Sequence, residues 1–161
     1  MAKNDKAPDK TNVMRLLDQA GIPYTQHYYD PDETAGEAIA GLLGEAPECV
    51  FKTLVTEDNR GGHHVFVIPV TGSLDLKKAA RAAGCKSIAM IKQKELLPLT
   101  GYVHGGCSPV GMKKPFPTFI DETALITDGF FCSAGRRGAQ IQVDPQALAD
   151  YIGAAFADVT E

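Results

Sequence analysis

A short run of strand-forming residues, Val50-Phe51-Lys52-Thr53-Leu54-Val55, constrains the fold more than any other stretch of this chain. Its β-branched and apolar residues predict a β-strand, and a lysine stands in the middle. Alternate side chains of a strand share a face, so Lys52 points the same way as Val50 and Leu54. An ammonium between apolar neighbours must reach water, pair with a charge or meet an anionic ligand. Two interpretations stay open: Lys52 protects a sheet edge against association, or it contacts an anion.

The length of 161 residues allows one domain with its own hydrophobic core. Hydrophobic residues at 44% and charged residues at 22% are ordinary for a globular protein. Residues 1–10 are polar and charged, and we expect them to form a flexible tail before a domain spanning residues 11–159. The sequence shows no signal peptide and no run of membrane-spanning length, so we expect a cytoplasmic protein that does not contact a membrane.

Cysteine and histidine spacing bears on metal and disulfide chemistry. The four cysteines, Cys49, Cys85, Cys107 and Cys132, are widely spaced and form no C-x-x-C pair. Without a secretory signal, reduced thiols are expected. The histidines show neither H-E-x-x-H nor a Cys/His zinc spacing, so the sequence predicts no metal site.

Charge is distributed unevenly along the chain, although the net charge is only −4. Every charged residue of range 30–58 is acidic except Lys52, whereas every charged residue of range 77–114 is basic except Glu95. Local charge matters most for binding a polyanion, because salt screens attraction beyond about 8 to 10 Å. The basic side chains therefore form either a phosphate-binding face or the solvated face of a helix. The candidates for phosphate contact are Lys77, Lys78, Arg81, Lys113 and Lys114.

Hydrophobic periodicity and turn residues predict the order of helices and strands. Helices are predicted at 11–20, 36–43, 76–83, 93–97 and 145–156, and strands at 24–29, 50–56, 64–70, 86–90, 118–121, 130–133 and 139–143. Helices interrupt the strands irregularly and hairpins occur among them. The pattern predicts a single α/β domain of the α+β type with a mixed or antiparallel sheet.

Two glycine-rich stretches, residues 102–118 and 133–138, are candidates for binding loops. Glycine allows a backbone to approach a ligand closely and to direct N–H groups at an oxyanion or phosphate. Neither stretch has the spacing of a nucleotide P-loop, and both could be purely structural loops. Cys107 could act as a nucleophile with His104, although a cysteine at this spacing is more often a buried small residue.

The motifs occur in a definite order. Phe51-Lys52-Thr53-Leu54 is followed by Gly101-Tyr102, by residues 105–111 with Lys113-Lys114, and by residues 133–138, with Ile22-Pro23-Tyr24 near the start. Over residues 11–159 this set resembles the YbaK/EbsC family of aminoacyl-tRNA deacylases. The resemblance implies one α/β domain on a mixed, barrel-like sheet surrounded by helices, with no metal or cofactor. Members hydrolyse mischarged tRNA freed from a synthetase, typically cysteine on tRNA(Pro) and also cysteine on tRNA(Cys).

The family resemblance also implies roles for particular residues. Lys52 matches the invariant lysine that holds the tRNA 3′ end and the aminoacyl ester, and residues 105–109 match the G-x-x-x-P loop that shapes the aminoacyl pocket. The chain departs from the family pattern at Cys107, Ala134 and Gln140. The roles implied are catalysis for Lys52, Gly105 and Gly106, and substrate binding for Tyr29, Phe51, Thr53, Pro109 and Ser133.

The lack of a conventional nucleophile predicts that the thiol of the substrate cysteine attacks its own ester, because proximity can supply much of the acceleration. Lys52 and backbone N–H groups near Gly105 and Gly106 would stabilise the oxyanion. The expected partners are tRNA(Pro), tRNA(Cys) and prolyl-tRNA synthetase, and both monomer and dimer stay open. Two alternatives also remain: a deacylase for another residue, such as alanine on tRNA(Pro), and a non-catalytic module that binds tRNA or a synthetase.

Overall fold

The computed structural model describes residues 10–33 and 35–161. The helices are α1 (Asn12–Ala20), α2 (Gly36–Leu43), α3 (Leu76–Ala83), α4 (Gln93–Thr100) and α5 (Pro145–Ile152), with short 3₁₀ helices η2 (Pro47–Cys49) and η3 (Glu122–Ile126). The strands are β1 (Tyr24–Tyr28), β2 (Phe51–Asp58), β3 (His63–Pro69), β4 (Ile88–Met90), β5 (Thr118–Asp121), β6 (Phe130–Ser133), β7 (Ala139–Val143) and β8 (Ala155–Ala157). The predicted tail lies outside the described residues except for Lys10, whose Nζ lies 2.6 Å from Asp18 Oδ2.

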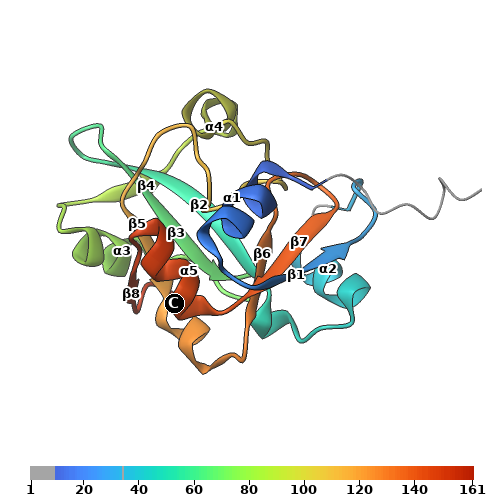
Figure 1. The fold of residues 1–161 in the computed structure, drawn as a ribbon. Helices are drawn as coiled ribbons and strands as arrows, with labels where there is room; N and C mark the ends of the chain where they lie inside the picture. The colour runs from blue at the N-terminus through green and yellow to red at the C-terminus, as the bar shows by residue number, and fades with distance from the viewer. Residues whose placement is uncertain (1–9, 34) are drawn as a thin grey trace, which may run out of the picture.

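The strands form two sheets (Figure 1). The first has the order β1-β7-β6 and is antiparallel throughout. The second has the order β4-β2-β3-β5-β8, in which β2 is antiparallel to both β3 and β4, whereas β5 is parallel to both β3 and β8. A parallel bridge between Val50 and Phe131 connects the sheets. The predicted α+β class with mixed strand pairing is confirmed, and within the described residues the two sheets do not close into one barrel.

Each helix packs through the apolar face that its sequence predicts. In α1 the hydroxyl of Thr11 accepts a hydrogen bond from Met14 N, and Gly21 ends the helix at φ 73°, a conformation that favours glycine. The buried side of α1 joins the main core, which includes Phe51 and Ile141. Helix α3 buries Ala79 and Ala80 in a second core with Phe66 and Ile68 of β3. Figure 1 shows α3 beside the five-stranded sheet. Ala40 of α2 packs with Val50 and Phe131 in a third, smaller core.

The prediction that the fourth helix ends at Leu97 is wrong. Helix α4 continues through Pro98 to Thr100. A proline inside a helix removes one hydrogen bond to the residue four positions earlier. Two neighbouring bonds hold the final turn: Thr100 Oγ1 donates to Leu96 O at 2.7 Å and Gly101 N donates to Leu97 O at 2.9 Å.

The prediction that the last helix extends to Phe156 is also wrong. Helix α5 ends at Ile152 because Gly153 adopts a left-handed conformation with φ 71°. The following residues form β8, which pairs with β5 through Phe119 and Asp121. Residues 155–157 therefore extend the sheet, where long-range pairing outweighs the local helical pattern.

Candidate functional site

The candidate site lies at an unpaired edge of β2. Strand β3 pairs with one edge of β2 along its length, but β4 pairs with the other edge only from Thr56 to Asp58. Val50 O accepts from Val70 N at 2.8 Å on the β3 side, and Val55 O accepts from Ile91 N at 3.3 Å on the opposite side. Because backbone groups alternate in direction along an antiparallel strand, the N–H and C=O of Thr53 face the unpaired edge.

A pocket of about 160 Å³ lies against this edge. A cavity of about 150 Å³ holds a molecule the size of benzene, so the pocket has room for a small aminoacyl group. No acidic side chain of residues 10–33 or 35–161 lines it. Its lining comes from β2, α2, α4, the loop after α4, β6 and β7: Gly36, Ile39, Val50, Phe51, Lys52, Thr53, Leu54, Val70, Leu96, His104, Gly105, Cys107, Ser133 and Gln140.

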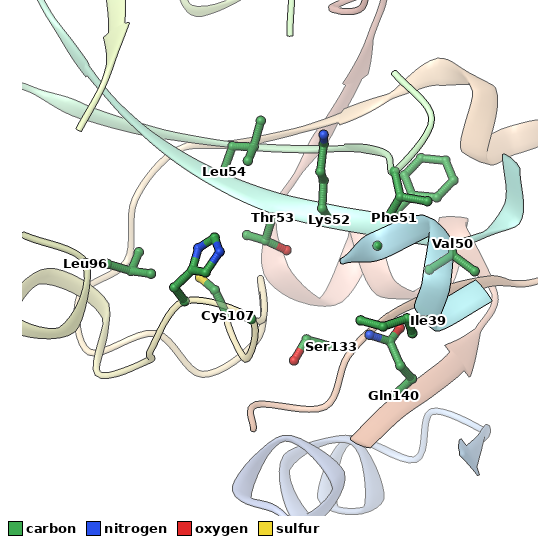
Figure 2. A pocket seen from close by; sticks show the side chains of 14 residues that line it. Ile39, Val50, Phe51, Lys52, Thr53, Leu54, Leu96, Cys107, Ser133 and Gln140 are labelled. Carbon is green, nitrogen blue, oxygen red and sulfur yellow. The ribbon is translucent and has the colours of Figure 1, made fainter. Parts of the chain in front are cut away.

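Lys52 and Thr53 leave β2 in different directions (Figure 2). The ammonium of Lys52 points away from Cys107 and Ser133, on the same side as Leu54, whereas Thr53 lies toward Cys107. Lys52 is half-buried, and no carboxylate among the described residues pairs with it. The alternation predicted from the sequence is therefore confirmed for Lys52, Thr53 and Leu54, and the structure leaves the charge of Lys52 available at the rim of the pocket.

The two glycine-rich stretches meet beside the pocket. Arg137 Nε donates to His104 O at 2.9 Å. A Cβ atom on Gly106 would lie 3.0 Å from backbone atoms of Arg136 and Arg137, so this contact requires glycine. Gly106 N donates to Val103 O at 3.0 Å. Of the two backbone N–H groups expected to bind an oxyanion, that of Gly106 is therefore already occupied. Gly105 N has no such partner among the described residues.

Two buried polar atoms in the pocket lack hydrogen-bond partners among the described residues: Thr53 Oγ1 and Gln140 Oε1. A buried polar group without a partner costs about 1 to 3 kcal/mol. Both atoms can accept a hydrogen bond. Their shared position in a cavity without carboxylates indicates a polar ligand that carries N–H or O–H donors.

Cys107 lines the pocket as a buried thiol. Burial raises the pKa of Cys107 to about 12, so the thiol stays protonated at neutral pH. Since the thiolate is the nucleophilic form, this environment does not suit a catalytic cysteine. His104 also lines the pocket, but it is not among the causes that shift the pKa of Cys107.

The other sequence-predicted site residues occupy different surroundings. Ser133 lines the pocket, and its Oγ accepts from Gly135 N at 3.1 Å. Phe51 lines the pocket but packs mainly in the core, edge-on to Phe130 at a centroid distance of 5.1 Å. Pro109 is buried in the loop and is not part of the lining. Tyr29 is likewise outside the lining, and its buried hydroxyl has no partner among the described residues.

Sequence reasoning missed the apolar wall of the pocket. Ile39 of α2 and Leu96 of α4 line it together with Gly36 and Val70. The helical pattern assigns Ile39 and Leu96 to apolar faces but does not say which cavity they border. Only the packing of α2 and α4 next to β2 supplies that information.

The proposed phosphate-contacting side chains are not equally available. Lys78 Nζ lies 3.1 Å from Asp158 Oδ2 and donates to Thr160 O at 2.8 Å, so it holds the C-terminal segment. The remaining four, Lys77, Arg81, Lys113 and Lys114, are exposed. All four cysteines are described, and none forms a disulfide. Among the described residues, no helix combines the length and apolar character needed to cross a membrane.

Comparison with known proteins identifies the family. The model of the aminoacyl-tRNA editing domain matches residues 30–151, which include both glycine-rich stretches and the whole pocket lining. The chain belongs to the aminoacyl-tRNA editing domain family. The resemblance stated from the sequence is therefore confirmed.

Relatives of this editing-domain chain match it almost end to end. A protein of Enterococcus faecalis, provisionally named Cys-tRNA(Pro)/Cys-tRNA(Cys) deacylase EbsC, is 43% identical over 162 residues, covering 99% of this chain and 98% of that protein. A structure described as a candidate trans-editing enzyme for prolyl tRNA synthetase has a TM-score of 0.81 at 25% identity and covers 95% of this chain and 99% of the other. The hypothetical protein APE2540 has a TM-score of 0.87 at 27% identity, with 94% and 100% coverage.

Proposed function

We propose that this protein removes cysteine from Cys-tRNA(Pro), and also from Cys-tRNA(Cys), by hydrolytic editing in the cytoplasm. The observation that carries the proposal is the small carboxylate-free pocket at the unpaired edge of β2, with Lys52 at its rim and unpartnered acceptors inside. The name of the relative from E. faecalis supports the choice of substrate.

Different residues of the site would bind different parts of the aminoacyl-tRNA. The ammonium of Lys52 would pair with the phosphate at the 3′ end of the tRNA, since no protein carboxylate among the described residues neutralises it. Gln140 Oε1 and Thr53 Oγ1 would accept hydrogen bonds from the α-ammonium of the cysteinyl group. The exposed cations near the pocket loop, Lys113 and Lys114, would contact other phosphates of the tRNA.

The chemistry would begin with the thiol of the substrate. As the thiol loses its proton, its sulfur bonds to the ester carbonyl carbon, the bond from that carbon to the ribose oxygen breaks, and this oxygen gains a proton. The ring that forms contains the sulfur, Cβ, Cα and the carbonyl carbon, and its thiolactone then opens in water. Backbone N–H groups of Gly105 and Thr53, together with Lys52, would stabilise the oxyanion.

The deciding experiment compares deacylation of Cys-tRNA(Pro), Ala-tRNA(Pro) and Ser-tRNA(Pro) by the wild type and by Lys52→Ala. We expect selective loss of cysteine and a rate for Lys52→Ala lower by about 100- to 1000-fold, which is the usual cost of losing one oxyanion-stabilising group. Lys94→Ala, at an exposed lysine of α4 outside the pocket, is the matched control and should keep the wild-type rate. Cys107→Ala should also stay active, because its thiol is protonated.

Other outcomes would lead to other functions. Hydrolysis of Ala-tRNA(Pro) alone would keep the site but replace the thiol mechanism. Rapid hydrolysis of Ser-tRNA(Pro) would point to activated water. Tight binding of tRNA without turnover in a single-turnover assay would indicate a binding module, and co-purification with prolyl-tRNA synthetase would then test a synthetase partner.

A further inference from the structure

A second group of reactive side chains lies at the other end of β2. Asp58 ends β2, His64 lies near the start of β3, and Cys85 follows α3. The carboxylate Oδ2 of Asp58 lies 2.9 Å from Nε2 of His64, and one ligand atom from each of the three residues lies within 4.8 Å of the other two. Lys52 and Asp58 are separated by about 20 Å along the strand at about 3.3 Å per residue. The group is therefore separate from the pocket.

Local hydrogen bonds hold Asp58 in position. Its other oxygen, Oδ1, accepts from Arg60 N at 2.8 Å and from Gly62 N at 2.9 Å, so the turn between β2 and β3 fixes the carboxylate. The contact with His64, and after it these two backbone bonds, lower the pKa of Asp58 to about 2. Asp58 is therefore ionised throughout the neutral pH range and directs Oδ2 toward His64.

The segment that carries Cys85 is tied to the same turn. Asn59 Oδ1 accepts from Lys86 N at 3.2 Å and from Ser87 N at 3.3 Å. The sulfur of Cys85 has only weak contacts, 3.7 Å from each of Ala80 O and Ser87 O, so it is free to move toward a stronger partner. Asp58 and His64 expose only 13% and 12% of their side chains, which limits the access of bulk water.

Imidazole nitrogen, thiolate sulfur and carboxylate oxygen are the three ligand types that zinc takes in proteins. Zinc–ligand bonds of about 2.0 to 2.3 Å in a tetrahedron separate neighbouring ligand atoms by roughly 3.3 to 3.8 Å, so modest side-chain movement would bring the trio into range. We propose that Asp58, His64 and Cys85 form a binding site for one zinc ion, with water in the fourth position. The ion joins the β2–β3 turn to the segment after α3.

Charge balance agrees with a divalent ion. A zinc ion held by Cys85 and Asp58 would bind the sulfur as a thiolate, because a coordinated thiol loses its proton. The carboxylate and thiolate together then neutralise the two positive charges of the ion.

The test uses the full chain, stripped of metal and kept reduced with a phosphine, and titrated with Co²⁺ as a spectroscopic probe. We expect one equivalent of Co²⁺ to produce a thiolate-to-cobalt charge-transfer band in the near ultraviolet, and Zn²⁺ to abolish it by displacement. Cys85→Ser should lose the band. The control Cys49→Ser, at a half-buried cysteine outside the group, should keep it.

His64→Gln and Asp58→Asn should each weaken Co²⁺ binding by more than about 10-fold, since even loss of an outer-shell partner costs about 10- to 100-fold. Zn²⁺ should raise the thermal midpoint of the wild type and of Cys49→Ser but not that of Cys85→Ser. Because the site is remote from Lys52, Cys85→Ser should keep the wild-type deacylation rate, which also shows that it folds. The absence of a band in the wild type, or an unchanged band in Cys85→Ser, would overturn the proposal.

Discussion

The two ends of β2 have different surroundings because their edges are paired differently. From Lys52 to Leu54 only β3 pairs with the strand, and the free edge borders a pocket with unpartnered acceptors. From Thr56 to Asp58 the strand is paired on both sides, and the side chains of Thr56 and Asp58 both bond to His64. An open edge leaves backbone and side-chain groups for a ligand, whereas a closed edge holds side chains at fixed distances.

The largest effect on this comparison is expected at the glycine contact beside the pocket. Gly106→Ala would place a methyl group 3.0 Å from the backbone of Arg136 and Arg137, so the loop must move. Misplacement by about 1 Å can cost about 100-fold in rate, and we expect a loss of that order in deacylation of Cys-tRNA(Pro). Gly41→Ala is the control, since no atom lies within 4 Å of its added Cβ. Equal activity of the two variants would show that the loop contact does not position the site.

The second-largest effect is expected on the free energy of unfolding at alkaline pH. Burial raises the pKa of Cys107 and Cys132 from about 9 to about 12, and that of Tyr102 from about 10 to about 12. The folded state then holds more protons than the unfolded state, so the free energy of unfolding falls as pH rises from about 9 to about 12. Each group contributes up to about 1.4 kcal/mol per pH unit.

Urea unfolding at several pH values measures this slope. Cys132→Ala removes one such proton and should flatten the slope, whatever its effect on stability at neutral pH. Cys49→Ala should flatten it less, because Cys49 is less buried. A slope unchanged in Cys132→Ala would contradict the burial argument.

The smallest expected effect compares one substitution at both ends of β2. Thr53→Val removes a buried hydroxyl without a partner, so the free energy of unfolding should rise by about 1 kcal/mol while deacylation falls. Thr56→Val removes a hydroxyl that donates to His64 O at 2.8 Å, so the free energy of unfolding should fall by about 1 kcal/mol and deacylation should persist. Denaturant titration checks both signs. If the two variants changed stability in the same direction, the contrast between the open and closed edges would be lost.

Most elements could be predicted from local signals. Helices α2 and α3 have the predicted limits, and α1 differs from its predicted range only by starting one residue later. The errors at Pro98 and at Phe156 have different causes. Hydrogen bonds within the helix hold the last turn of α4 beyond the proline, whereas pairing of β8 with β5 places the residues after Gly153 and Ala154 in the sheet. Local alternation also predicted that Lys52 and Leu54 share one face of a strand while Thr53 lies on the other, and Figure 2 agrees with this.

The candidate site was predictable only in part. The order of the motifs pointed to the family and to Lys52, Thr53, Gly105 and Ser133, all of which line one pocket. The hydrogen bond of Gly106 N to Val103 O, and the placing of Pro109 and Tyr29 outside the lining, depend on how the loops pack. Local spacing has no access to such contacts.

The amino-acid sequence by itself determined the class of fold, the order of helices and strands, and the family. Helix and strand propensities act over short distances along the chain, and the family is visible in the order of its motifs. Only the tertiary structure decided that β2 has one open and one closed end. It also brought Asp58, His64 and Cys85 together, although their spacing predicts no metal site. Those residues lie on separate segments, and the distance between them is set by strand pairing and packing rather than by their separation in the chain.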